Sequence, residues 1–206
     1  MRAMIALAHP LAMVLALAVV LVHTPRVAQA QDVDREKLLA DDRALWADVM
    51  DVEGQHAAHP TGWTHIEEKD AGVALSFPCK PERQAQTVED RTVVQFLCAV
   101  GQRGYIAQFE ERELDNAVSK LAFLVSATAN IADKLRESGL DVKVVPVHHL
   151  TYGDARGRQS RIETEELVME LRALIRPGGT VLLGVRDVPG GLPGNMPQFF
   201  DSLELR

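Results

Sequence analysis

The chain has 206 residues, with 22 Lys and Arg against 29 Asp and Glu and a formal net charge of −7. This length allows one domain with a sizeable buried core and, at most, an extension. The acidic balance opposes binding to phosphate backbones and to anionic lipid, so neither nucleic acid nor a membrane surface is expected as a partner.

The first thirty residues have the pattern of an export signal. Arg2 precedes an apolar stretch over residues 4–22, and residues 28–30 (Ala-Gln-Ala) offer a small-x-small cleavage site. An uncleaved membrane anchor is the alternative, because an apolar run of this length can just span a bilayer. Pro10 and the cleavage site favour removal of residues 1–30. We therefore expect a periplasmic or secreted protein that is free of the membrane after cleavage.

Residues 31–62 are predicted to form an N-terminal amphipathic helix and a linker. The apolar residues between Asp34 and Asp51 recur at helical spacing. They are Leu38, Leu39, Leu45, Trp46, Val49 and Met50. Docking onto the rest of the protein is the favoured role, with binding of a partner as the alternative. Residues 52–62 contain the Gly and Pro punctuation of a linker.

The only two cysteines, Cys79 and Cys98, follow or end strand-like segments. Segments 72–77, 92–100 and 105–110 are expected to form a β-meander that starts the sheet. An even number of cysteines in an exported protein favours a disulfide bond, with a redox or a metal pair as alternatives. A redox pair normally has C-x-x-C spacing, which is absent. We predict a structural disulfide that closes a loop of about 20 residues and contributes roughly 3 kcal/mol.

The rest of the chain alternates between helix and strand patterns. Residues 114–137 keep an apolar helical stripe for over five turns, and Gly139 is placed to end the helix. Strands are then expected at residues 142–148, 155–163, 167–175 and 180–186. A short helix around Phe199 closes the chain. This order favours a single α+β domain over residues 63–206, with an antiparallel sheet sandwiched by helices (α/β/α).

Two short motifs resemble a known class of domains. Residues 73–81 (Val-Ala-Leu-Ser-Phe-Pro-Cys-Lys-Pro) resemble the strand and Phe-Pro-Gly-x-Pro opening of a widespread class of bacterial exported domains. Residues 199–205 (Phe-Phe-Asp-Ser-Leu-Glu-Leu) resemble their closing segment. These domains are similar in fold to the photosystem II extrinsic protein PsbP and to a Ran-binding nuclear import factor. The resemblance implies a PsbP-like sandwich and no common catalytic residues. Cys79 stands where the usual pattern has glycine, which suggests that a bridge to Cys98 replaces a flexible turn.

Five histidines outside the signal are candidate metal ligands: His56, His59, His65, His148 and His149. The first two are three residues apart, but they lie in the predicted linker with no acid or cysteine at ligand spacing. The last two are neighbours on a strand, so their side chains point to opposite faces and only one can join a cluster. A structural role is favoured for all five, and we predict neither a metal nor a cofactor.

No catalytic constellation is recognisable. The chain has no Gly-x-Ser-x-Gly motif. Ser119 and Ser126 lie on the predicted long helix, and Ser160 lies on a polar strand. Adjacent acids, such as those at 67–68 and 110–111, are expected to be solvated. We therefore predict no catalytic residues.

Four arginines can form a local basic patch on this acidic protein: Arg103, Arg156, Arg158 and Arg161. Strand alternation places Arg156 and Arg158 on one face and Arg161 on the other. A carboxylate-bearing or polymeric ligand is conceivable there, but a solvated strand face is the favoured interpretation.

These observations favour a non-catalytic exported module that binds an unidentified protein or small molecule. One alternative is a metal-dependent factor or enzyme that uses His148 or His149 with nearby acids. Another is a structural or stress-related envelope protein. The sequence does not indicate an oligomeric state.

Overall fold

The structure is a computed structural model that describes residues 35–54, 59–88, 91–111, 114 and 116–206. The predicted signal peptide over residues 1–30 and His56 lie outside these ranges. Within them, no helix is both long and apolar enough to cross a bilayer.

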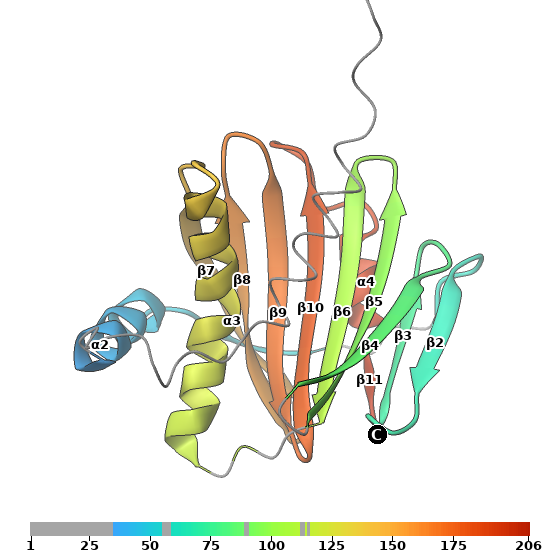
Figure 1. The fold of residues 1–206 in the computed structure, drawn as a ribbon, viewed down its shortest axis with the longest axis horizontal. Coiled ribbons are helices and arrows are strands. Elements are labelled where there is room, and N and C mark those ends of the chain that lie inside the picture. The colour runs from blue at the N-terminus through green and yellow to red at the C-terminus, as the bar shows by residue number, and fades with distance from the viewer. Residues whose placement is uncertain (1–34, 55–58, 89–90, 112–113, 115) are drawn as a thin grey trace, which may run out of the picture.

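The described residues form a mixed α+β fold with two sheets (Figure 1). In chain order its elements are α2 (Arg35–Trp46), β1 (Asp51–Glu53), β2 (Thr64–Glu68), β3 (Val73–Phe77), β4 (Glu82–Val88), β5 (Arg91–Val100), β6 (Arg103–Glu111), α3 (Ala117–Glu137), β7 (Lys143–Tyr152), β8 (Ala155–Glu163), β9 (Val168–Arg176), β10 (Gly179–Asp187), α4 (Met196–Asp201) and β11 (Glu204–Leu205). The large sheet has eight strands in the order β1-β7-β8-β9-β10-β6-β5-β4, and the small sheet has three in the order β11-β3-β2. All pairs are antiparallel except β1 with β7.

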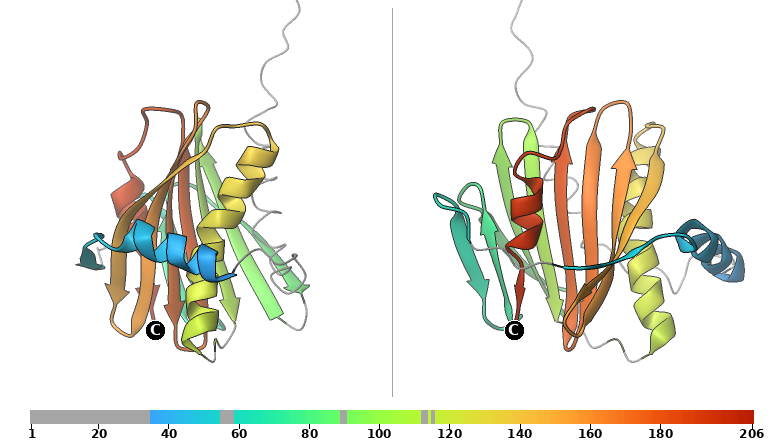
Figure 2. Two further views of the ribbon diagram at one scale, coloured as in Figure 1. Left: turned by 90° about the vertical axis from the view of Figure 1, so that its left-hand side faces the viewer. Right: turned by 180° about the vertical axis from the view of Figure 1, so that it is seen from behind.

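The large sheet is the middle layer of the molecule. Helix α3 lies on one face, and the small sheet with α4 covers part of the other (Figure 2). The predicted helices on both faces are therefore present only in part, because β2, β3 and β11 hydrogen-bond to one another and supply most of the second covering layer.

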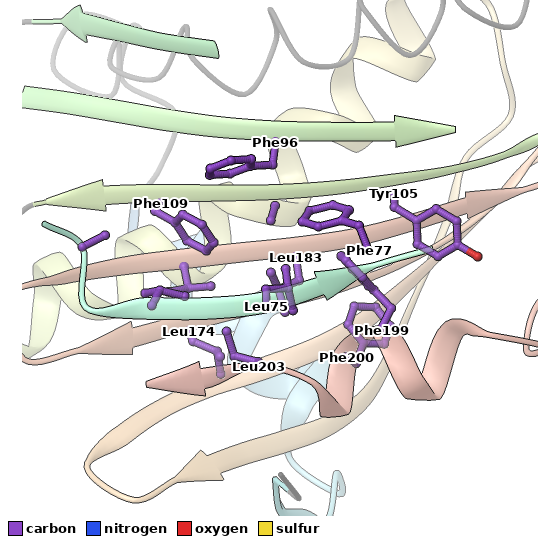
Figure 3. Packing of buried hydrophobic residues seen from close by; sticks show 14 of the residues in the cluster. Leu75, Phe77, Phe96, Tyr105, Phe109, Leu174, Leu183, Phe199, Phe200 and Leu203 are labelled. Carbon is purple, nitrogen blue, oxygen red and sulfur yellow. The ribbon is translucent and has the colours of Figure 1, made fainter. Parts of the chain in front are cut away.

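Strand β10 shows how both faces of the large sheet are buried. Val181, Leu183 and Val185 belong to the core cluster beneath the small sheet, whereas Leu182 belongs to the cluster beneath α3. Successive side chains of a strand point to opposite faces, so a strand covered on both sides needs apolar residues at consecutive positions. Figure 3 shows the first cluster, in which Phe199 contacts Phe77 edge-on with ring centroids 5.3 Å apart.

Helix α3 confirms the strongest helical pattern in the sequence. Asn116 caps its N-terminus by accepting a hydrogen bond of 2.9 Å from the Ser119 amide. Gly139 follows its C-terminus with φ of 88°, a left-handed conformation that favours glycine. The side chains that dock the helix on β8 and β9 lie in its C-terminal half, where Ile131 and Leu135 are buried.

The predicted β-meander is wrong in one respect. Strands β5 and β6 pair as expected, but β3 belongs to the small sheet with β2 and β11. The connection over residues 78–81 carries the chain from the small sheet to the large one. The structure joins Cys79 of this connection to Cys98 of β5 by a disulfide with a Cα–Cα distance of 6.0 Å. The bridge therefore links two sheets rather than two neighbouring strands.

The N-terminal segment docks through fewer residues than its stripe predicts. Trp46 is buried at 8% exposure, but Leu45 and Met50 are 44% and 74% exposed. Part of the predicted linker is instead strand β1, in which Val52 pairs with Leu150 at the edge of the large sheet.

Candidate ligand-binding pocket

A pocket of about 350 Å³ opens between the two sheets, at the end where the β2–β3 turn faces strands β4, β5 and β6. Its lining residues are Glu68, Asp70, Ala71, Arg83, Thr92, Val94, Phe109 and Glu111. Gly72 shapes the turn with φ of 58°, and a Cβ there would come within 2.9 Å of the Arg206 carbonyl oxygen. The small sheet therefore supplies one wall and the large sheet the other.

The floor of the pocket is made of buried core residues. Val94 and Phe109 are 6% and 1% exposed and belong to the cluster beneath the small sheet, in which Phe109 contacts Phe96 (Figure 3). Their positions on β5 and β6 are directly opposite, so the two side chains lie side by side. The floor can accept an apolar group.

The rim of the pocket is charged. Arg83 of β4 donates two hydrogen bonds to Glu68 of β2, at 3.0 and 3.3 Å, and these raise the pKa of the guanidinium. This pair ties the two walls together. Asp70 and Glu111 form no ion pair with any of the described residues. The charge of Asp70 acts on Arg83 and that of Glu111 on Arg176, but neither carboxylate is held in an ion pair by a residue that the structure describes, so both can contact a ligand.

Arg176 of β9 lies beside the pocket. It donates to the carbonyl oxygen of Ala71, a lining residue, and at 3.0 Å to that of Pro177. Burial lowers the pKa of this guanidinium, and the charge of Glu111 acts in the opposite direction. The rim then has three acids (Glu68, Asp70 and Glu111) and two arginines (Arg83 and Arg176), so its net charge is −1.

A second polar cluster holds α4 to the large sheet. Arg172 of β9 donates to Tyr152, to Gln159 at 2.8 Å and to Asp201 at 3.3 Å, and its guanidinium lies 4.5 Å from the Phe200 ring centroid. These contacts fix the short helix on the sheet, which is a structural role.

Glu170, a buried acid of β9, lies in the same region. Burial raises the pKa of Glu170, against the hydrogen bond from Gln159 at 3.2 Å and the charge of Arg161. Its position beneath the surface limits access to a ligand, because only 5% of the residue is exposed.

His59 and His65 meet on the outer side of the small sheet, with ring centroids 3.9 Å apart. His59 contacts the Ser76 hydroxyl at 2.9 Å and the Glu204 carboxylate at 3.1 Å. The Ser76–His59–Glu204 contacts resemble a nucleophile with its base and acid. However, Ser76 is fully buried and its amide donates to Ser202. The contacts fasten residue 59 to the small sheet.

The remaining two histidines are at adjacent positions on β7, paired with Gln159 and Arg158. The His149 ring lies 5.0 Å from that of Trp46, so it supports α2. The Nδ1 atom of His148 is buried and has no hydrogen-bond partner among the described residues. No group of three potential metal ligands occurs in the described part of the chain.

The four arginines of the predicted basic patch do not face solvent as free cations. Three contact carboxylates: Arg103 pairs with Asp187, Arg158 with Asp42 at 2.7 Å, and Arg161 with Glu163 at 2.9 Å. Arg156 donates to backbone carbonyls of its own turn. Arg158 also lies 4.6 Å from the Trp46 ring centroid, so it docks α2.

The candidate serines have structural contacts. Ser126 donates to the Phe123 carbonyl within α3, and Ser160 lies 2.8 Å from Thr128, which joins helix to sheet. Ser119 supplies the capped amide of α3. None of the three lies beside a histidine in these contacts.

Comparison with known proteins adds little to the site. No family model matches the chain, and no curated protein matches it. Among solved structures, it is similar to PA94, a protein of unknown function from Pseudomonas aeruginosa, with 15% identity and a TM-score of 0.33. The match covers 70% of this chain and 97% of that one. A likeness this weak carries no functional argument.

Proposed function

We propose that the protein is an exported, non-catalytic binding module that holds a small ligand in the pocket between its two sheets. The volume of about 350 Å³ carries this proposal, because it falls in the range of small-molecule sites. Ala71, Val94 and Phe109 give the pocket an apolar floor, whereas its other five lining residues are charged or polar, more than is usual for such sites, which favours a ligand that carries a charged group.

The ligand that suits the pocket is an amphiphile with an apolar body and a cationic end. The body would contact Val94 and Phe109, and the cation would meet Asp70 and Glu111. A carboxylate of the same size is disfavoured, because the rim is net negative and Arg83 is already engaged by Glu68.

Export and a PsbP-like sandwich belong to the same proposal. A disulfide is compatible with an oxidising compartment, and residues 1–30 have the composition of a cleavable signal. Cell fractionation followed by N-terminal sequencing tests this directly: the processed protein should begin at Gln31. A cytoplasmic protein that begins at Met1 would contradict it.

Hexylamine and hexanoate, which share an alkyl chain and differ in charge, test the site. In NMR titrations, hexylamine should shift the resonances of Val94 and Phe109, and hexanoate should not. Glu111→Gln should weaken amine binding roughly tenfold, the loss expected from one charged contact of about 1.4 kcal/mol.

Glu137→Gln on the surface of α3 is the matched control and should leave the titration unchanged. Equal binding of both probes would refute the assignment of a cationic ligand. Shifts confined to residues away from the pocket would refute the site itself.

A further inference from the structure

Strand β4 is an open edge of the large sheet. It pairs with β5 along all seven residues, and its other side has no strand partner within the described chain. Five of its side chains are exposed: Glu82, Arg83, Ala85, Gln86 and Thr87. A free strand edge presents a row of backbone donors and acceptors that can pair with another strand.

Beyond the charged residues Glu82 and Arg83 at its start, this edge lacks the features that usually prevent such pairing. It contains no lysine and no proline, and its register with β5 is unbroken by a bulge. The opposite edge of the same sheet is β1, which has only three residues. The two edges of the small sheet are β11, which has two residues, and β2, which has five and ends in two acids. Strand β4 is therefore the longest free edge in the described structure.

We propose that β4 pairs with β4 of a second copy of this chain, antiparallel and about a two-fold axis at Ala85. The charge pattern of the strand selects this partner and this direction. Its charged residues, Glu82 and Arg83, are neighbours at one end, so an antiparallel copy places them at opposite ends of the interface. A parallel copy would set like charges against each other.

The two-fold register also places side chains that are compatible. Gln84 lies opposite Gln86 of the partner subunit, and Ala85 lies opposite Ala85 of the partner subunit. Within one copy Arg83 is paired with Glu68 and Glu82 accepts a hydrogen bond of 3.0 Å from Gln84, so both charged side chains have a partner before the strands meet. The large sheets of the two copies become one continuous sheet. The pairing runs through the backbone of β4, of whose side chains Arg83 is the one that also lines the pocket.

Charge substitutions at the two glutamines test the register. In Gln84→Lys/Gln86→Lys, two like-charged pairs face each other across the axis, and dimerisation should weaken roughly tenfold or more. In Gln84→Lys/Gln86→Glu, the same axis creates two opposite-charge pairs, and the dimer should form at least as well as the wild type. Sedimentation velocity over a concentration series, on protein processed in its own compartment, measures both.

Hydrogen exchange provides a readout on the unmodified protein. Amides of β4 should exchange more slowly as concentration rises, while those of the β2 edge should not change. Circular dichroism should show the same fold in both variants, since Gln86 is exposed and Gln84 only half-buried. A wild type that stays monomeric at every concentration would overturn the proposal. So would two variants with the same dimer affinity, or a slowing of exchange at β2 instead of β4.

Discussion

Asp187 provides a test of how the chain holds the loop that leads into α4. This residue ends β10 and is 8% exposed. Its carboxylate accepts hydrogen bonds from Arg103, at 3.0 Å for Nε, and from the amides of Val188 and Leu192 at 2.8 and 2.7 Å. One side chain therefore joins β6, β10 and the loop over residues 188–195.

The expected cost of Asp187→Ala follows from these contacts. Removing one member of a largely buried ion pair costs about 3–5 kcal/mol, because the other charge is left unpaired. The Arg103 side chain is 20% exposed and keeps a hydrogen bond of 2.9 Å to the Pro193 carbonyl, so the lower end applies. We expect a loss of about 3 kcal/mol in the free energy of unfolding. Asp187→Asn keeps an oxygen acceptor without the charge, and about half of that loss is expected.

The pH dependence of this contribution has a definite sign. Burial raises the pKa of Asp187, but the hydrogen bonds from Leu192, Arg103 and Val188 outweigh burial, and the net pKa is lowered. A carboxyl with a lowered folded pKa stabilises the protein above its unfolded pKa of about 3.9, and this stability is lost as pH falls through the folded pKa. The difference between wild type and Asp187→Asn should therefore be constant near neutrality and shrink only below about pH 4.

Urea denaturation of the three proteins at neutral and acidic pH measures these differences. Asp133→Ala is the control, because its ion pair with Arg136 is exposed on α3 and should be worth less than about 1 kcal/mol. The reasoning is refuted if Asp187→Ala costs no more than the control. A difference between wild type and Asp187→Asn that persists unchanged in strong acid would refute the assignment to charge.

The remaining predictions concern a buried acid and the disulfide. Burial raises the pKa of Glu170, so its contribution is fully present below its unfolded pKa and is lost as pH rises through the folded pKa. The stability of Glu170→Gln relative to the wild type should therefore increase as pH rises, as measured by the midpoints of urea denaturation. A decrease in its relative stability with pH would contradict this. Reduction of Cys79–Cys98 should lower the free energy of unfolding by about 3 kcal/mol, measured with and without reductant. A midpoint insensitive to reductant would contradict it.

The sequence predicts the individual elements of this fold well where periodicity decides them. The predicted helix over 114–137 corresponds to α3, and the strands predicted at 167–175 and 180–186 correspond to β9 and β10 within one or two residues. Such patterns are local, since a stripe or an alternation reports which face of an element is buried. The turn at Pro177-Gly178 is also a local signal, because it joins β9 directly to β10 and so makes them antiparallel neighbours.

Contacts between elements that are distant in the sequence cannot be read from such local patterns. The apolar stripe of the N-terminal helix predicts burial of Leu45 and Met50, yet Trp46 makes the docking contacts through Arg158 and His149 of the large sheet. These partners lie more than a hundred positions away in sequence. Nothing in the periodicity distinguishes Trp46 from the other apolar residues of the stripe.

The pocket could not be predicted because its residues come from two sheets. The acids at 67–68 and 110–111 are adjacent on their own strands, and the sequence predicts solvated faces for both pairs. That prediction is wrong for Glu110, which is 5% exposed and pairs with Arg91 at 2.8 Å. Glu68 and Glu111 become neighbours of one pocket only when the small sheet is placed on the large one. A signal for that placement is the connection over residues 78–81, because Pro78 and Pro81 have no amide hydrogen to donate to a strand ladder.

The disulfide also holds together the two sheets that form the walls of the pocket. Strands β3 and β5 both extend from the pocket, near Ala71 and Val94, to the end where Cys79 and Cys98 are joined. The bridge therefore pins the two walls at the end opposite the pocket, and non-covalent contacts hold the walls at the pocket itself. Among these is the Arg83–Glu68 pair, in which the Arg83 side chain is 50% exposed and the Glu68 side chain 12%. The two sheets are thus joined by a covalent bond at Cys79–Cys98 and by an ion pair beside the pocket.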